Sequence, residues 1–137
     1  MSTPAQPFVL LYHTLSAKEH WDLCLDIGPT LATWQIAADP TGKADNKTHS
    51  YPARRIANHR RAYLEHEGPI PGGRGEVRRV ERGTWRLVGQ ESDTWVVDLQ
   101  GTVLRGIYRL PAGPEPGEMS PVDPKSISRS DPDDRSA

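Results

Sequence analysis

The sequence contains a single cysteine, Cys24, so it can form no disulfide within the chain and no zinc site built from several cysteines. A metal bound by this chain must therefore be held by histidine and carboxylate side chains. No apolar run approaches the ~20 residues that a membrane-spanning helix needs, and no basic-then-apolar signal segment follows Met1. We therefore expect a cytoplasmic protein that has no membrane partner.

The chain is long enough for one domain and too short for two, because a typical domain has roughly 100 to 150 residues. After Leu110 the sequence becomes rich in proline, glycine, serine and aspartate and has almost no apolar side chains to bury. We therefore expect one folded domain over residues 1–110 and a disordered tail over residues 111–137. Nothing in the sequence predicts the oligomeric state.

Short stretches in which apolar and polar residues alternate dominate the first 110 residues, and this pattern is typical of half-buried strands. The 12 glycines and 13 prolines argue against long helices and mark turns, for example at Gly28-Pro29 and at Gly83. The predicted fold is all-β, a small closed or partly closed antiparallel β-barrel. We expect strands over residues 7–13, 20–27, 30–37, 50–57, 75–81, 83–88, 93–100 and 102–110.

Residues 58–66 are the exception, because they combine good helix formers with a plausible cap at Asn58 and a stop at Gly68. One or two helical turns in this segment would place His59 and Tyr63 on the same face, since residues four apart are neighbours on a helix. We therefore expect one short helical segment in the barrel.

Two polar residues of the second predicted strand, His20 and Asp22, form a candidate metal pair. Side chains two apart in a strand point the same way from Cα atoms about 6.5 to 7 Å apart, so they can converge on one ion. His13 ends the first predicted strand, and a loop over residues 14–19 would return it to His20. This mixed nitrogen and oxygen set suits Mn²⁺, Fe²⁺ or Zn²⁺. The alternative is an ordinary amphipathic strand whose polar face meets water.

Arginines cluster near these residues, although the formal net charge of the chain is only −1. A local basic patch of this kind would contact phosphates; a solvated charged strand face is the other interpretation. His49 and His66 have no assigned role. The arginines are Arg54, Arg55, Arg60 and Arg61, on both sides of His59, followed by Arg74, Arg78, Arg79 and Arg82.

Between Phe8 and Leu110 the sequence resembles the DNA ligase D 3′-phosphoesterase domain family, here as a stand-alone member. The matching segments occur in the family's order, and it is this order that makes the resemblance specific. They are His13, His20-Trp21-Asp22-Leu23-Cys24-Leu25, Thr33-Trp34, Asn58-His59 with Tyr63, His66-Glu67-Gly68-Pro69-Ile70-Pro71, Gly72-Gly73-Arg74-Gly75, Gly83-Thr84-Trp85, Leu99-Gln100-Gly101 and Leu104-Arg105-Gly106.

The resemblance implies a manganese-dependent phosphoesterase that removes a terminal ribonucleoside and then the phosphate from blocked 3′ ends of DNA or RNA/DNA primers. Zn²⁺ or another divalent transition metal is the alternative cofactor, and a separate ligase or polymerase is an expected partner in DNA repair. Carried over by position, His13, His20 and Asp22 would bind the metal, while His59 and Tyr63 would hold the scissile phosphate. We expect Arg54, Arg55, Arg60 and Arg74 to contact phosphates of the nucleic acid.

Three features depart from the family pattern. Cys24 stands where the family has an arginine, which can grip a phosphate through two hydrogen bonds as a thiol cannot. Leu11 stands where it has a glutamine, and we expect the family's N-terminal arm to be missing before Phe8. These departures favour a second interpretation, a metal- and DNA-end-binding module with little or no activity. In a third interpretation, His20, Asp22 and His59 form the iron site of a non-haem oxygenase.

Overall fold

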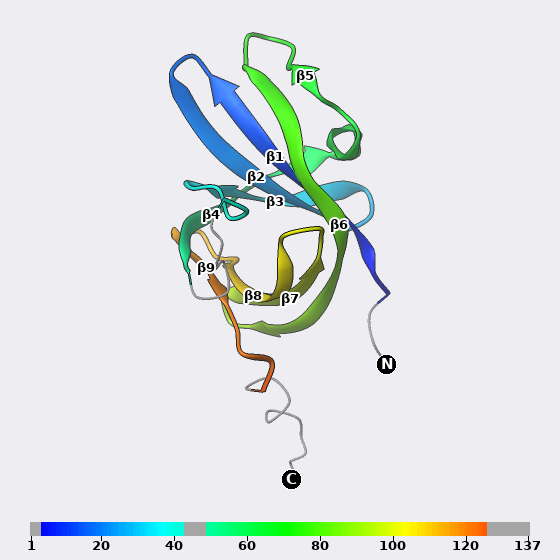
Figure 1. Cartoon of the computed structure of the whole chain (residues 1–137), viewed down its shortest axis with the longest axis vertical. Coiled ribbons are helices and arrows are strands. Elements are labelled where there is room, and N and C mark those ends of the chain that lie inside the picture. Colours follow the sequence, from blue (N-terminus) through cyan, green and yellow to red (C-terminus); the bar gives the residue numbers. More distant parts are fainter. Residues whose placement is uncertain (1–3, 43–48, 126–137) are drawn as a thin grey trace.

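The computed structural model describes residues 4–42 and 49–125. In these residues, nine strands form a single antiparallel sheet that closes on itself, and one 3₁₀ turn follows the fourth strand (Figure 1). The elements are β1 (Gln6–Leu15), β2 (Lys18–Asp26), β3 (Thr30–Ile36), β4 (Tyr51–Arg60), η1 (Arg61–Leu64), β5 (Gly68–Pro69), β6 (Glu76–Glu91), β7 (Thr94–Gln100), β8 (Arg105–Pro111) and β9 (Gly117–Pro121).

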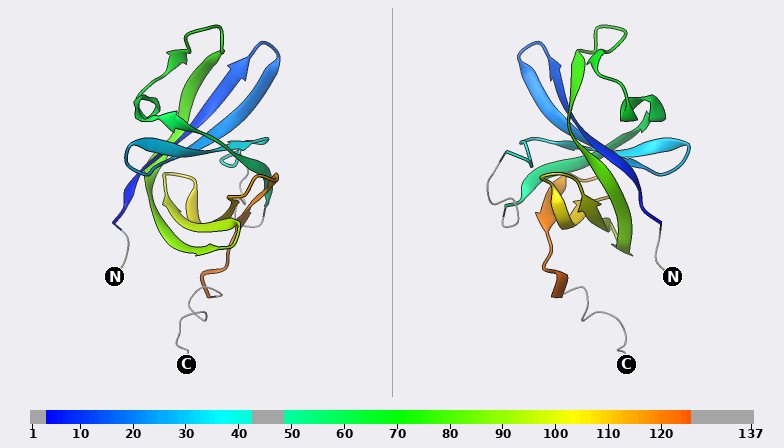
Figure 2. Two further views of the ribbon diagram at one scale, coloured as in Figure 1. Left: turned by 180° about the vertical axis from the view of Figure 1, so that it is seen from behind. Right: turned by 45° about the vertical axis from the view of Figure 1, so that its right-hand side comes forward.

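Neighbouring strands follow the order β1-β2-β3-β4-β9-β8-β7-β6-β5, and an additional β1–β6 pairing closes the ring. The prediction of an all-β, closed antiparallel sheet with one short helical segment is thereby confirmed. The ring is uneven, because β4 pairs with β9 over only three residue positions while β1 pairs with β2 over eight. The β1–β2 hairpin and the start of β6 extend beyond the ring (Figures 1 and 2).

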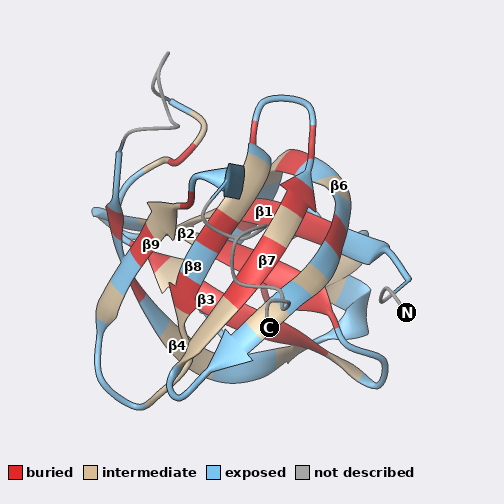
Figure 3. Ribbon diagram, turned by 90° about the horizontal axis from the view of Figure 1, so that it is seen from below, coloured by how far each residue is buried: buried red, intermediate tan, exposed pale blue. Residues whose placement is uncertain are grey.

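Alternation along the strands separates two apolar clusters. Phe8 and Leu10 of β1 point into the ring and pack with Leu25, Trp34 and other core residues, and buried positions accordingly gather on the walls of β1, β3, β7 and β8 (Figure 3). The intervening positions face outward yet are also buried, because η1 and the segment leading to β6 cover them. This outer cluster contains Val9, Leu11, Cys24, Leu31, Ile70 and Val77, with Tyr63 and Leu64 packed against it.

The predicted turn at Gly83 was wrong, because β6 runs without interruption through this residue and joins the two strands expected over 75–81 and 83–88. A Cβ atom at Gly83 would lie 2.0 Å from the carbonyl oxygen of Gln100. The glycine is therefore required by the close approach of β7 rather than by a turn.

Strand replaces the start of the helical segment expected over residues 58–66, and one 3₁₀ turn over Arg61–Leu64 forms the rest. Asn58 and His59 belong to β4, where His59 pairs with Leu31, and only the four residues of η1 are helical. Arg60 precedes η1 with no side-chain cap. Pairing with β3 thus overrides the local helix propensity. Among the residues described, no helix is long and apolar enough to cross a membrane.

The prediction that everything after Leu110 is disordered was also wrong for the described part of that segment. β9 inserts between β4 and β8, and Met119 is completely buried against the core. Main-chain pairing and one or two buried apolar side chains are enough for so short a strand, which is why composition did not reveal it. The rest of the predicted tail, residues 126–137, lies outside the described residues.

Candidate functional site

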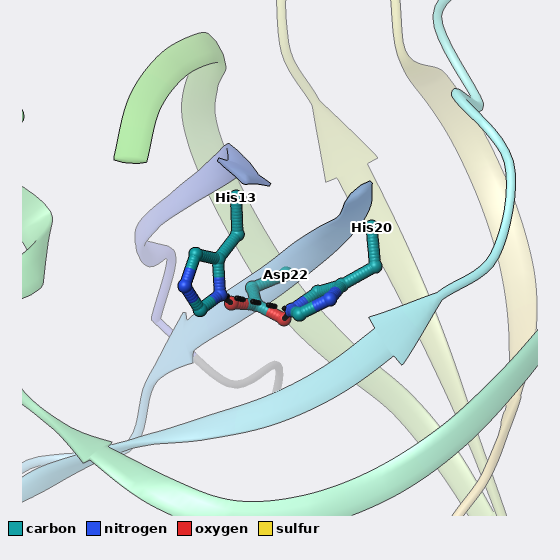
Figure 4. Close-up of side chains that lie close together, drawn as sticks. All are labelled: His13, His20 and Asp22. Atoms are coloured by element: carbon teal, nitrogen blue, oxygen red, sulfur yellow. Dashed lines mark hydrogen bonds and ion pairs between the residues drawn. The ribbon is translucent and has the colours of Figure 1, made fainter. Parts of the chain in front are cut away.

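Pairing of β1 with β2 brings His13, His20 and Asp22 to one place on the outer face of the sheet. His13 lies directly opposite His20, and Leu11 lies directly opposite Asp22. The expected loop over residues 14–19 is a tight hairpin instead, because both strands continue to the turn at Ser16 and Ala17. Since paired residues and residues two apart share a face, the three side chains converge (Figure 4).

The three side chains present ligand atoms at distances that suit one cation. His13 Nδ1 lies 3.0 Å from His20 Nε2 and 3.6 Å from Asp22 Oδ2, and His20 Nε2 lies 3.1 Å from Asp22 Oδ1. Ligands about 2.1 Å from an ion are about 3.0 Å apart in octahedral geometry and about 3.4 Å apart in tetrahedral geometry. The observed separations agree with either arrangement.

Asp22 is a buried carboxylate, 1% exposed, whose Oδ1 meets no donor other than His20 Nε2 among the described residues. Burial alone would raise the pKa of Asp22, but the hydrogen bonds and positive charge of His20 and His59 outweigh it and lower the pKa overall. The carboxylate is therefore ionised. A buried negative charge with one under-coordinated oxygen is the environment that a cation stabilises.

Two main-chain carbonyls orient the imidazoles around this carboxylate. His13 Nε2 lies 2.8 Å from the Arg74 carbonyl oxygen, and His59 Nδ1 lies 3.3 Å from that of Ala57. A carbonyl can only accept, so the proton sits on the nitrogen that faces it. In a neutral His13 the opposite nitrogen, Nδ1, then presents its lone pair to the site, an arrangement common around metal ligands.

His59 and Tyr63 join the same site from β4 and η1. His59 Nε2 lies 3.6 Å from Asp22 Oδ2, and the rings of His59 and Tyr63 are 5.4 Å apart. The structure thus brings them together by a strand end followed by a 3₁₀ turn rather than by a helix. His66, which had no assigned role, lies edge-on to Tyr63 with its Nε2 2.9 Å from the Pro69 carbonyl oxygen.

A cavity of ≈ 390 Å³ opens beside these residues and reaches His13 and Asp22. Arg60 and Arg74 line it and are exposed, so two of the four arginines predicted to bind phosphate lie at this cavity. Four of its lining residues are apolar: Ile56, Ala57, Ile70 and Val77. The cavity is lined by His13, Asp22, Ile56, Ala57, Asn58, His59, Arg60, Tyr63, Ile70, Arg74 and Val77.

The other two predicted phosphate contacts lie elsewhere. Arg54 donates a hydrogen bond to the side chain of Gln35 and lines a separate hollow of ≈ 150 Å³. The guanidinium of Arg55 lies over the rings of Trp34 and Trp95, at 5.0 and 5.7 Å from the ring centroids, and donates to Asn58. Burial lowers the pKa of Arg55. The structure does not place either arginine in the cavity.

The two side-chain departures from the family pattern lie together in the outer apolar cluster. Cys24 and Leu11 are both completely buried there, with Val9 paired to Cys24 and Leu11 paired to Asp22. The Cys24 thiol is 3.8 Å from the Thr33 hydroxyl, and burial raises its pKa well above the ordinary value. This thiol is therefore neutral and packs as a small apolar group.

Three parts of the site went unrecognised in the sequence. The carbonyls of Ala57 and Arg74 carry no sequence signal, because every residue has a carbonyl group and only the fold decides where it points. Ile56 belonged to a predicted strand but nothing marked it as a cavity wall. Ile70 was recognisable only as a member of the Gly68-Pro69-Ile70-Pro71 motif.

Comparison with known families connects this geometry to one of them. Residues 12–111 match the family described as the DNA ligase D 3′-phosphoesterase domain. The match includes every residue of the cavity and runs from β1 to the end of β8. A search of the curated proteins finds no match to this sequence. Since the family match spans well over half of the chain, the protein belongs to the DNA ligase D 3′-phosphoesterase domain family.

Proposed function

We propose that this protein is a divalent-metal-dependent 3′-phosphoesterase that restores 3′-hydroxyl ends on DNA or RNA/DNA primers. The observation that carries the proposal is the convergence of ligand atoms of His13, His20 and Asp22 within 4.8 Å of one another, beside a cavity that His13, Asp22 and two arginines line. Family membership supports the same reaction class.

The residues present fit a transition metal. Two imidazole nitrogens and one buried carboxylate would hold it, and the under-coordinated Oδ1 of Asp22 and the carbonyl-oriented imidazole of His13 support this role. Mn²⁺ is our first choice, with Zn²⁺ as the alternative. When bound, the cation supplies Lewis-acid stabilisation of negative charge on the phosphoryl oxygens.

Side chains across the cavity would hold the phosphate itself. The Tyr63 hydroxyl and, in its doubly protonated form, the Nε2–H of His59 are hydrogen-bond donors for its non-bridging oxygens, and Arg60 and Arg74 add positive charge at the edge. Among the described residues, the Arg60 side chain has no hydrogen-bond or ion-pair partner, while Arg74 Nε donates to the Pro71 carbonyl and keeps its other donors. In removal of a 3′-phosphate, water adds to phosphorus, the bond from phosphorus to O3′ breaks, and O3′ takes up a proton; in removal of a terminal ribonucleoside, the bond from phosphorus to its O5′ breaks and O5′ takes up the proton.

A second function, binding of metal and DNA ends without turnover, is favoured by one observation. The position of the family's arginine is occupied by Cys24, which is buried and contributes no phosphate contact. Hydrogen bonds and ion pairs to the phosphate must then come from residues that line the cavity. The two functions differ in whether phosphate is released.

The test incubates the purified protein with Mn²⁺ and a primer–template that carries either a 3′-phosphate or a single 3′-terminal ribonucleotide. Primer ends are resolved on a sequencing gel, and loss of the free Mn²⁺ signal in electron paramagnetic resonance measures metal binding. We expect conversion to a 3′-hydroxyl by the wild type. His20→Ala should lose both metal binding and activity, since it removes one of three ligands.

His49→Ala is the matched control, because His49 stacks on Tyr51 outside the cavity. It should retain metal binding and activity. If the wild type binds Mn²⁺ and primer ends but releases no phosphate, the non-catalytic function is correct. Unchanged Mn²⁺ affinity in His20→Ala would remove the basis of the metal site.

A further inference from the structure

A second hollow lies along β6, where this strand meets the loop between β7 and β8. It has a volume of ≈ 360 Å³ and is lined by Arg79, Val80, Glu81, Arg82, Thr102 and Val103. Val103 is 52% exposed, the highest value among the exposed large apolar residues. The hollow therefore combines two guanidinium groups with an exposed apolar surface, and the reaction at the metal site uses none of its residues.

Strand register places the two arginines on the same face as the metal site. Arg79 pairs with Leu11 of β1, which in turn pairs with Asp22 of β2, so these three residues form one row across the sheet. Because neighbouring strands are about 4.8 Å apart, Arg79 and Asp22 are separated by roughly 10 Å at Cα. Arg82 occupies the next row, opposite Val9.

Most of the positive charge of this hollow is free to meet a ligand. Arg82 is exposed, and its guanidinium has no hydrogen-bond or ion-pair partner in the described ranges. The guanidinium of Arg79 donates only to the Leu64 carbonyl, at 3.2 Å, and keeps further N–H groups.

Two carboxylates lie nearby, and both are occupied by main-chain N–H groups. Glu67 accepts from the Arg79 amide at 2.8 Å. Glu81 accepts from the amides of Thr102, Val103, Leu104 and Arg82 at 2.7 to 3.0 Å and is itself buried. The amides thus hold both carboxylates in place, and the donors that remain available to a ligand in the hollow are those of the two guanidinium groups.

We infer that this hollow binds the sugar–phosphate backbone of the nucleic-acid strand whose 3′ end occupies the metal site. The inference rests on the proposed function, because that function identifies the ligand as a nucleic acid. Arginines grip phosphates through paired N–H groups, and Val80 and Val103 offer an apolar surface to a sugar or base. The strand would cross η1, which carries no acidic side chain in its first turn. Substrates with several nucleotides before the 3′ end then bind more tightly than a single nucleotide.

The experiment measures binding of a short, fluorescent, 3′-phosphorylated single strand by anisotropy, in EDTA so that no turnover occurs, at increasing KCl. Arg82→Gln should weaken binding several-fold and reduce the slope of log affinity against log salt by about 0.7, the value for one phosphate contact on a single strand. Arg82→Lys should restore the slope because it keeps the charge. Arg109→Gln, at an exposed position on β8, is the matched control and should change neither.

The inference fails if Arg82→Gln leaves affinity and slope unchanged, or if Arg109→Gln reduces them equally. A second readout separates this failure from that of the proposed function. Release of phosphate from a nucleoside 3′-monophosphate should be the same in Arg82→Gln and wild type, while the KM for the oligonucleotide rises only in the variant. If the KM for each substrate is the same in Arg82→Gln as in the wild type, the hollow does not bind the strand, while the phosphoesterase function stands. Binding without any phosphate release would overturn the phosphoesterase and leave the hollow.

Discussion

The Nε2 atom of His13 lies 2.8 Å from the main-chain carbonyl oxygen of Arg74, 61 residues further along the chain. This contact joins the β1–β2 hairpin to the glycine-rich loop before β6. It fixes which nitrogen of His13 faces Asp22, and the same loop carries the Arg74 side chain at the cavity edge. The position of the loop should therefore determine both metal affinity and phosphate binding.

Gly75→Ala should disturb this loop and weaken metal binding. Gly75 has φ +88°, and a Cβ atom there would lie 1.9 Å from the Thr14 carbonyl oxygen, so the loop must move away from β1. Loss of a carbonyl that orients a metal-bound histidine typically lowers metal affinity about 10- to 100-fold. We expect a loss of Mn²⁺ affinity in this range, measured by electron paramagnetic resonance.

Gly73→Ala is the control in the same loop. Its φ is +68°, but no heavy atom lies within 4 Å of the added Cβ atom. The backbone strain of about 1 kcal/mol should lower stability slightly without moving the Arg74 carbonyl. Equal metal affinities in the two variants would show that the contact between His13 and Arg74 does not govern the site.

Restoring the family's arginine at position 24 should destabilise this protein rather than activate it. Cys24 is completely buried in one apolar cluster with Val9, Leu31 and Val77, so an arginine would have to displace apolar side chains or bury its charge. Overpacking alone costs typically 1 to 3 kcal/mol, and an unpaired buried charge adds to it. Urea unfolding should show a loss of at least about 2 kcal/mol.

The control for this substitution is Cys24→Ser, which preserves size and should cost less, since the serine hydroxyl can still approach Thr33. The double variant Leu11→Gln with Cys24→Arg should recover part of the lost stability, because both family side chains are then polar and adjacent. A stable, more active single Cys24→Arg variant would contradict the packing argument.

Glu81 should make the folding stability depend on pH in the acid range. Burial alone raises the pKa of Glu81, but hydrogen bonds from the amides of Leu104, Thr102, Val103 and Arg82 outweigh it and lower the pKa. A lowered pKa in the folded state means that the stabilisation is fully present above the unfolded-state pKa. It is lost as pH falls through the folded-state value, when the carboxylate is protonated.

Glu81→Gln should therefore cost on the order of 2 kcal/mol at pH 7, because it replaces charged hydrogen bonds and points an amide N–H₂ group at main-chain donors. The difference in free energy of unfolding between wild type and variant should shrink below a pH of about 4.5. Urea unfolding at several pH values measures it. A difference that stays constant with pH would mean that the carboxylate charge does not stabilise the β7–β8 loop.

The sequence predicted most of the strands and the shared face of His20 and Asp22 because both follow from local alternation, whereas His13 reaches them through the β1–β2 pairing. Positions two apart on a strand share a face whatever the rest of the fold does. Two other features depended on strands distant in sequence. They are the strands with which β9 pairs and the role of Gly83, which allows a close contact rather than a turn. Local patterns cannot show such contacts.

The roles of the arginines were the least accessible from sequence, for a related reason. Arg54, Arg55 and Arg60 are near neighbours on β4, yet only Arg60 lines the cavity. The β3–β4 pairing shifts register between Leu31 and Thr33, so a simple two-residue period does not hold through this part of β4. A strand irregularity of this kind leaves no clear mark in the sequence.

Arg55 should therefore contribute to stability rather than to phosphate binding. Its guanidinium lies over Trp34 and Trp95 and donates to Asn58 at 2.7 Å, while Asn58 donates in turn to the Thr30 hydroxyl at 3.0 Å. A cation over aromatic rings is worth up to about 2 kcal/mol when desolvated, and a hydrogen bond adds about 1. Arg55→Ala should lower the free energy of unfolding by about 2 kcal/mol.

The same substitution should leave the salt dependence of oligonucleotide binding unchanged, since no phosphate contact is removed. Arg54→Ala, at the neighbouring exposed position, is the matched control and should alter stability by less than about 0.5 kcal/mol. Urea unfolding and anisotropy titrations on the two variants supply both measurements. If Arg55→Ala instead kept its stability and reduced the salt slope by about 0.7, Arg55 would leave Trp34 and Trp95 to bind phosphate, as the sequence first suggested.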